Sequence, residues 1–247
     1  MEHCHSDISS GILYLVATPI GNLEDITLRA LRVLKEVDLI AAEDTRRTKK
    51  LLNHYQIATP VTSYFEHSSV RKTHSLIAQL KGGKQIALVS EAGTPSISDP
   101  GFTLTTQAIE HQIRVTPIPG PSALTAALSA SGLPTHSFVF EGFVPRKAGK
   151  RKSLFVSLKG EIRTLILYES PRRVTATLRD LLTVLGERKI VIVRELTKMF
   201  EEIIRGNLSE VLAQLEGKTI KGEVTLVVSG TPSSPPPGLI DREQRIW

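Results

Sequence analysis

The sequence predicts an α/β protein with two lobes, in which the first sheet is mainly parallel and the second is mixed. In the first half of the chain, short apolar runs alternate with segments of helical spacing, the pattern of a parallel sheet covered by helices. The turn Ser131-Gly132-Leu133-Pro134-Thr135 interrupts this alternation. After it, two apolar strands between Ile190 and Arg205 have no helix between them, which predicts antiparallel pairing and hence a mixed sheet.

The first lobe begins with a strand from Ile12 to Val16 that runs into the turn Thr18-Pro19-Ile20-Gly21-Asn22. Leu28, Leu31 and Leu34 follow at helical spacing and predict a helix. The unit of strand, loop and helix then repeats. The further elements expected are strands Asp38 to Ala42, Val61 to Phe65, Gln85 to Val89 and Arg114 to Ile118, and helices Thr45 to Tyr55, Ser69 to Leu80, Phe102 to His111 and Ala123 to Ala130.

A domain boundary is expected near residue 134, so that the first lobe covers residues 11–133 and the second covers 134–230. Residues 231–247 are rich in Pro and Ser and predict a loose tail. The second lobe is expected to contain strands Phe138 to Phe143, Thr164 to Tyr168, Ile190 to Leu196, Glu201 to Arg205 and Val224 to Val228, and helices Arg172 to Leu185 and Leu208 to Leu215.

Composition limits the possible functions of the 247-residue chain. No apolar run approaches the roughly 20 residues that cross a bilayer, so no membrane partner is expected. The single cysteine, Cys4, and an N-terminus without the order of a signal peptide favour the cytoplasm. GxGxxG, P-loop and CxxC signatures are absent, and His3-Cys4-His5 has nothing to orient it, so no metal is expected.

The net charge of +6 is concentrated in three basic clusters. By itself, each cluster is equally well explained as a solvated helix face. Together they favour a substrate that carries phosphates. The clusters are Arg46, Arg47, Lys49 and Lys50; Arg146, Lys147, Lys150, Arg151 and Lys152; and Arg172 with Arg173.

A long loop from Glu91 to Gly101 follows the strand that ends at Val89 and carries two carboxylates among Gly, Pro and Ser residues. The turn after Val16 and the turn Pro119-Gly120-Pro121-Ser122 also follow strands of the first lobe. Parallel strands place all three at one sheet edge, where ligands bind in open α/β sheets. These three turns offer backbone groups, small side chains and few positive charges. Such a site suits a cationic, adenine-containing cofactor better than a diphosphate.

Five motifs, in this order, resemble the small-subunit ribosomal RNA methyltransferases of the tetrapyrrole methylase superfamily. The resemblance covers residues 11 to 230. The motifs are Leu13-Tyr14-Leu15-Val16-Ala17-Thr18-Pro19-Ile20-Gly21-Asn22-Leu23-Glu24-Asp25-Ile26, Ala42-Glu43-Asp44-Thr45-Arg46, the loop Glu91-Ala92-Gly93-Thr94-Pro95 with Ser98-Asp99-Pro100-Gly101, Pro119-Gly120-Pro121-Ser122-Ala123, and Arg194-Glu195-Leu196-Thr197-Lys198.

The resemblance implies a two-lobed tetrapyrrole-methylase-like fold with the cofactor between the lobes, and a homodimer. It also implies methylation, dependent on S-adenosylmethionine, of the ribose 2′-hydroxyl of a cytidine in the decoding region of 16S rRNA. Position by position, the cofactor-binding residues that it implies are Pro19, Ala92, Gly93, Thr94, Ile97, Ser122, Ala123, Glu169 and Gly206.

A ribose hydroxyl needs a group that accepts its proton, and Glu43, Asp44, Glu66 and His67 lie at the ends of the second and third strands. Helix capping or surface pairing explains each of them equally well, and Asp44 is an especially good cap. Glu43 aligns with an acidic residue implicated as a base in tetrapyrrole methylases, so it is the predicted catalytic residue. Two alternatives stay open: a methylase of a tetrapyrrole or another small molecule, and an RNA-binding assembly factor without activity.

Overall fold

The computed structural model describes residues 11–65 and 70–232, which form two compact units. The first unit comprises the chain up to Ala126 together with Leu196–Phe200, and the second comprises Ala127–Glu195 and the chain from Glu201. The division falls inside helix α5 (Ala123–Ser131), and the boundary near residue 134 stays a prediction. The expected tail lies almost wholly outside the described residues, as does His3-Cys4-His5.

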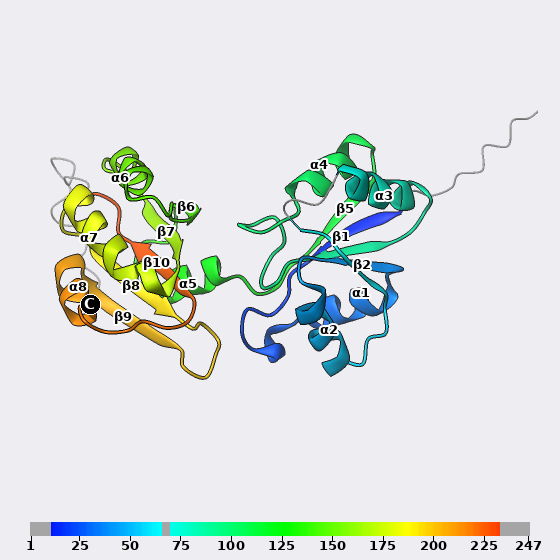
Figure 1. Cartoon of the computed structure of the whole chain (residues 1–247), viewed down its shortest axis with the longest axis horizontal. Coiled ribbons are helices and arrows are strands. Elements are labelled where there is room, and N and C mark those ends of the chain that lie inside the picture. Colours follow the sequence, from blue (N-terminus) through cyan, green and yellow to red (C-terminus); the bar gives the residue numbers. More distant parts are fainter. Residues whose placement is uncertain (1–10, 66–69, 233–247) are drawn as a thin grey trace, which may run out of the picture. The chain divides into compact units, whose positions relative to one another are not determined.

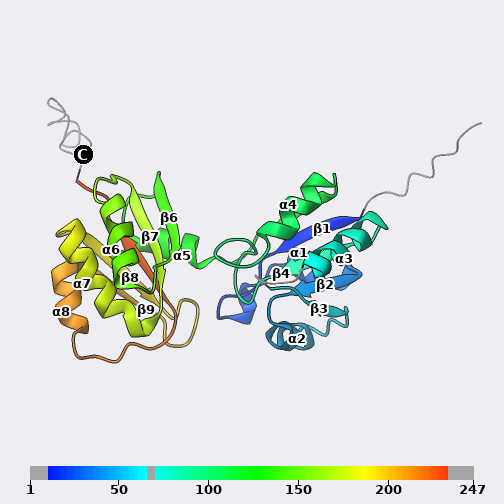
Figure 2. The same cartoon turned by 45° about the horizontal axis from the view of Figure 1, so that its top comes forward.

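The first unit contains a five-stranded sheet in the order β3-β2-β4-β1-β5, and every neighbouring pair is parallel. The expected parallel sheet is therefore confirmed. Its strands are β1 (Ile12–Val16), β2 (Leu39–Ala42), β3 (Val61–Ser63), β4 (Ile86–Val89) and β5 (Arg114–Ile118). Figure 1 labels β1, β2 and β5, and Figure 2 labels β3 and β4.

Helices cover both faces of this sheet, as Figures 1 and 2 show. One face packs against α1 (Leu28–Glu36) and α2 (Thr45–His54), with Ala42 and Val89 among the buried residues. The other face packs against α3 (Val70–Lys81) and α4 (Phe102–Glu110). With both faces covered, ligands can reach the strands only at their ends.

The second unit contains a mixed sheet in the order β6-β7-β10-β8-β9. The β6 and β7 strands pair in parallel, whereas β10 runs antiparallel to β7 and β8, and β8 pairs antiparallel with β9 as expected. The strands are β6 (Phe138–Phe143), β7 (Thr164–Glu169), β8 (Lys189–Arg194), β9 (Glu202–Asn207) and β10 (Val224–Val228).

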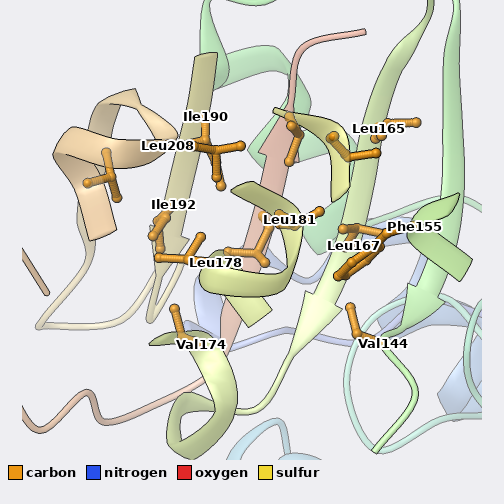
Figure 3. Packing of buried hydrophobic residues seen from close by; sticks show 14 of the residues in the cluster. Val144, Phe155, Leu165, Leu167, Val174, Leu178, Leu181, Ile190, Ile192 and Leu208 are labelled. Atoms are coloured by element: carbon orange, nitrogen blue, oxygen red, sulfur yellow. The ribbon is translucent and has the colours of Figure 1, made fainter. Parts of the chain in front are cut away.

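One face of the second sheet carries the core of its unit (Figure 3). Leu178 and Leu181 of α7 (Val174–Leu185) and Leu208 of α8 (Leu208–Leu215) pack there against strand residues such as Leu167 and Ile192. Phe155 joins them from α6 (Ala148–Ser157), a helix that the sequence analysis did not predict for the basic segment. Two 3-10 turns, Leu23–Asp25 and Pro171–Arg173, complete the described elements.

Candidate active site at the strand ends of the first unit

Hydrogen bonds join the turns that follow β1, β4 and β5 at one edge of the first sheet. The backbones of Thr18 and Gly93 exchange two hydrogen bonds, each with an N to O distance of 2.9 Å. The hydroxyl of Thr94 donates to the carbonyl oxygen of Pro121 over 3.4 Å. The prediction that the three loops meet at one edge is therefore confirmed.

Two glycines shape the loop after β4. Gly93 has a φ of 88°, which disfavours an L side chain, and this conformation brings its backbone to Thr18. Gly101 has a φ of 146°, and a Cβ there would collide with the hydroxyl of Ser96. Within the described chain, the buried Oγ atoms of Ser96 and Thr105 have no hydrogen-bond partner. In this loop, the backbone of Gly93 therefore lies against that of Thr18, and the buried hydroxyl of Ser96 is available for a hydrogen bond.

Seven of the nine predicted cofactor-binding residues lie along this edge, and none of them is charged. Gly93 is buried, and Ile97 is 43% exposed. Backbone groups, small side chains and nearby carboxylates fit a nucleoside that bears a positive sulfonium. The seven residues are Pro19, Ala92, Gly93, Thr94, Ile97, Ser122 and Ala123.

The remaining two, Glu169 and Gly206, belong to the second unit, and their part in the site stays a prediction. Glu169 is 2% exposed, and its carboxylate accepts hydrogen bonds from the N–H of Ser170 (2.6 Å) and the hydroxyl of Thr177 (2.6 Å). It also pairs with Arg173 at 2.5 Å. These contacts fasten the end of β7 to the start of α7.

Glu43 lies directly after β2 and faces the loop after β4. Its Oε2 accepts a hydrogen bond from the backbone N–H of Glu91 over 3.0 Å, and the Glu91 side chain forms an ion pair with Arg47 of α2. The adjacent Asp44 is the N-cap of α2, because its Oδ1 accepts from the N–H groups of Arg46 (2.7 Å) and Arg47 (3.2 Å). These bonds lower the pKa of Asp44. Of the two neighbouring acids, Asp44 caps helix α2, whereas Glu43 binds the loop after β4 at the edge of the sheet.

Asp99 joins this acidic group and was not among the predicted site residues. Burial raises its pKa to about 7, and the charges of Glu43 and Glu91 act in the same direction, against a hydrogen bond with the Ser90 side chain. A carboxyl group with a pKa near neutrality is suited to proton transfer. The sequence placed Asp99 in the loop but gave no distance from Asp99 to Glu43. The other two candidate bases, Glu66 and His67, lie outside the described residues.

Each basic cluster contains an arginine that is bound to a carboxylate. Arg47 pairs with Glu91, and Arg173 with Glu169. Arg151 is 7% exposed and holds Asp180 through Nε (2.7 Å) and Nη2 (2.6 Å). The three clusters together favour a substrate that carries phosphates, but Arg151 cannot contribute to such a contact, because its guanidinium is buried. Exposed cations remain in every cluster, among them Arg46, Lys49, Lys50, Arg146, Lys147, Lys150 and Arg172.

Within 11–65 and 70–232, no group of three or more His, Cys, Asp or Glu side chains could hold a metal ion. None of the helices in these two segments has both the length and the hydropathy of a membrane span.

Comparison with known proteins agrees with the motifs and the fold. Residues 12–212 match the family model described as Tetrapyrrole (Corrin/Porphyrin) Methylases. The chain is 56% identical over 220 residues to "Ribosomal RNA small subunit methyltransferase I" of Halalkalibacterium halodurans, covering 89% of this chain and 76% of that protein. A protein of the same name from Thermotoga maritima is 50% identical over 220 residues, which cover 89% of this chain and 99% of that one.

Solved structures with lower sequence identity share the fold. A uroporphyrin-III-C-methyltransferase from Thermus thermophilus superposes with a TM-score of 0.62 and 23% identity, covering 89% of this chain and 94% of that chain. A diphthine synthase gives a TM-score of 0.67 and 16% identity, covering 90% and 92%. At these identities, the likeness concerns the fold alone.

Proposed function

The chain belongs to the tetrapyrrole (corrin/porphyrin) methylase family and is an S-adenosylmethionine-dependent methyltransferase, and we propose that its substrate is the RNA of the small ribosomal subunit. Within that RNA, the proposed acceptor is the ribose 2′-hydroxyl of a cytidine in the decoding region of 16S rRNA. Relatives that are 50% and 56% identical carry the name of a small-subunit rRNA methyltransferase, and exposed cations lie in all three basic clusters. Both observations favour RNA over a tetrapyrrole.

S-Adenosylmethionine supplies a methyl group on a positively charged sulfur, which makes that carbon electrophilic. In the first unit, the residues proposed to hold S-adenosylmethionine belong to the three turns that hydrogen bonds join. They are Pro19, Ala92, Gly93, Thr94, Ile97, Ser122 and Ala123. Their bonds to one another fix the turns before any ligand arrives. Such a preformed edge orients reactants, and in favourable cases orientation is equivalent to an effective concentration of about 10⁵ to 10⁸ M.

The ribose hydroxyl becomes a better nucleophile when its proton is accepted as the new C–O bond forms. We assign this role to Glu43, with Asp99 as its coupled neighbour. The two carboxyl groups influence each other electrostatically, so the pH at which the proton is accepted belongs to the pair. Help from a general base is equivalent to a rate increase of roughly 10² to 10⁴.

Exposed cations are proposed to grip the RNA backbone. Arg46, Lys49 and Lys50 lie on α2, whose first residue comes two positions after Glu43, and Arg146 and Lys147 lie ahead of α6. Contacts of this kind give affinity that depends on salt, and they carry no choice of sequence.

The observation that carries the proposal is the acidic group of Glu43, Glu91 and Asp99 beside uncharged, hydrogen-bonded turns. Its test is methyl incorporation into three substrates: 30S subunits, naked 16S rRNA and a corrin precursor, with cofactor affinity measured by calorimetry. Methylation of the RNA at a cytidine ribose supports the proposal. Methylation of the corrin alone identifies a small-molecule methylase, and cofactor binding without any transfer identifies an inactive factor.

A homodimer and a cytoplasmic location are further proposals that rest on the family resemblance and on the single cysteine. Light scattering coupled to size-exclusion chromatography tests the first, since a dimer has twice the 27.1 kDa mass of the chain. Cell fractionation with an antibody against the protein tests the second.

A further inference from the structure

A pocket lies at the C-terminal end of α2. Gly21 and Asn22, the last residues of the turn after β1, line part of it, and none of the seven predicted cofactor-binding residues of this unit does. It is a shallow depression, open to solvent, with a volume of about 490 Å³, which is within the usual size of a small-molecule site. All of its lining residues belong to the first unit. They are Gly21, Asn22, Leu23, Glu24, His54, Thr197, Lys198 and Met199.

The walls of this pocket are fixed by contacts of their own. The side chain of Asn22 accepts from the N–H of Glu24 over 3.1 Å and caps the 3-10 turn. The hydroxyl of Tyr55 donates to the carbonyl oxygen of Leu23 over 2.7 Å and ties the end of α2 to that turn. A Cβ at Gly21 would collide with the side chain of Lys198, so residues 197 and 198 pack directly on the glycine. The pocket is therefore preformed.

Its lining chemistry suits a nucleobase. Glu24 is exposed and offers a carboxylate, which accepts hydrogen bonds from the exocyclic amino group of cytosine. The ring of His54 is braced edge-on by Tyr55, with 4.7 Å between the ring centroids, and aromatic rings stack on unpaired bases of RNA. Met199 is 91% exposed and adds a flexible apolar surface.

The exposed face of α2 connects this pocket to the candidate active site. Arg46, Lys50 and His54 recur every four residues and so share one face of the helix, and all three are exposed. The helix begins just after Glu43 and ends at His54, and its 10 residues span about 15 Å. An RNA strand that follows these cations would place one nucleotide near Glu43 and the base of a different nucleotide at the pocket.

We propose that this pocket binds an unpaired nucleobase that flanks the methylated nucleotide and so helps to select the site of methylation. The inference rests on the proposed RNA substrate. It assigns base recognition to Glu24 and His54, and phosphate contacts to the cations between His54 and Glu43.

The direct test follows the ring resonances of His54 by NMR while cytidine, uridine, adenosine and guanosine 5′-monophosphates are added. We expect saturable shifts for His54 and none for His111, the C-cap residue of α4, which serves as the internal control. The amino-bearing bases should bind about tenfold more tightly than uracil, and Glu24→Gln should remove that preference. Glu110→Gln, at an exposed glutamate of α4, is the matched control and should keep it.

Three results would overturn the inference. No shift of His54 at millimolar nucleotide would mean that the pocket takes no base. Equal shifts with ribose 5-phosphate would mean that only the phosphate binds. Displacement of the nucleotides by S-adenosylhomocysteine would assign the pocket to the cofactor.

Methylation assays separate this inference from the proposed function. With small-subunit RNA as substrate, His54→Ala and Glu24→Gln should raise the KM for RNA about tenfold and leave kcat unchanged. If the protein methylates no RNA, the proposed function fails while the NMR titration still reports on the pocket. If RNA is methylated with unchanged KM in both variants, the pocket assignment fails alone.

Discussion

Glu43 Oε2 lies 3.0 Å from the backbone nitrogen of Glu91, so the residue after β2 holds the first residue of the loop after β4. The side chain of Glu91 forms an ion pair with Arg47, and Glu91 contacts Glu43 through its backbone N–H. The side chains of the two glutamates therefore make different connections. One connects adjacent strand ends, and the other connects a loop to the basic face of α2.

Replacing Glu43 by Gln should lower the single-turnover rate of methyl transfer by about 10² to 10⁴. The amide oxygen still accepts from Glu91, so the loop stays in place while the base is lost. Calorimetry should therefore find unchanged cofactor affinity. A full rate with normal cofactor binding would remove Glu43 from the proposed role.

The rate of transfer should rise with pH through about 7, because Asp99 is protonated below its raised pKa and ionised above it. The charges of Glu43 and Glu91 act on this carboxyl group, and Glu91 is itself paired with Arg47. Asp99→Asn should flatten the rise of the rate with pH. In Glu43→Gln, any remaining rise should occur at lower pH, because the negative charge of Glu43 no longer raises the pKa of Asp99. Measuring kcat/KM from pH 5 to 9 checks both, and an unchanged profile in Asp99→Asn would exclude Asp99 from the proton transfer.

Stability should respond to the same carboxyl group. Its folded-state pKa of about 7 lies above the unfolded value of about 3.9, so the folded protein binds this proton more tightly. The contribution of Asp99 to stability is therefore greatest below pH 4 and is lost as the pH rises towards 7. Urea unfolding at pH 8 should find Asp99→Asn more stable than the parent by about 1 kcal/mol after allowance for solvent screening. A less stable variant at pH 8 would contradict this.

Replacing Arg146, Lys147 and Lys150 by Gln should weaken RNA binding and reduce its salt slope by about 2, since each lost phosphate contact on a single strand removes about 0.7. All three residues are exposed. The matched control keeps the charges as Arg146→Lys, Lys147→Arg and Lys150→Arg, and should retain the slope. Fluorescence anisotropy over a range of salt concentrations measures both, and equal slopes in the two variants would remove the segment from the RNA footprint.

Asp180→Asn should lower the free energy of unfolding by about 3 kcal/mol, because it leaves the buried guanidinium of Arg151 without its counter-charge. Glu216→Gln is the matched control. It breaks an ion pair with Arg179 in which both side chains are more than half exposed, so it should cost less than about 1 kcal/mol. Denaturant titration compares the two, and equal losses would mean that the Arg151 pair is no stronger than a surface pair.

Most elements of the fold could be predicted because periodicity is local. The strands Ile12–Val16, Arg114–Ile118 and Phe138–Phe143 begin and end where the sequence predicts. Helix α6 was missed because its first turn is basic and contains Gly149, and its large apolar residues appear only from Leu154. The strand order was beyond the sequence analysis, since pairing depends on contacts between segments that are far apart along the chain.

Some residues of the candidate site could likewise be located from the sequence, and others could not. The turns around Pro19, Gly93 and Ser122 could be located from Gly and Pro residues that follow apolar strands. Asp99 could not be distinguished from other loop acids, because its raised pKa arises from burial and from the charges of distant residues. Likewise, nothing in the sequence separates Arg151, which is buried against Asp180, from the exposed cations beside it.

Some arginines are exposed, whereas Arg151 and Arg173 are enclosed in ion pairs, and this difference matters for purifying the protein. Mobile ions screen exposed charges strongly and enclosed pairs much less. A wash in molar sodium chloride should strip adhering nucleic acid from the exposed lysines and arginines, while the enclosed Arg151 and Arg173 pairs keep the second sheet and its helices together. Purified this way, the enzyme should leave the column free of RNA and with its melting temperature intact.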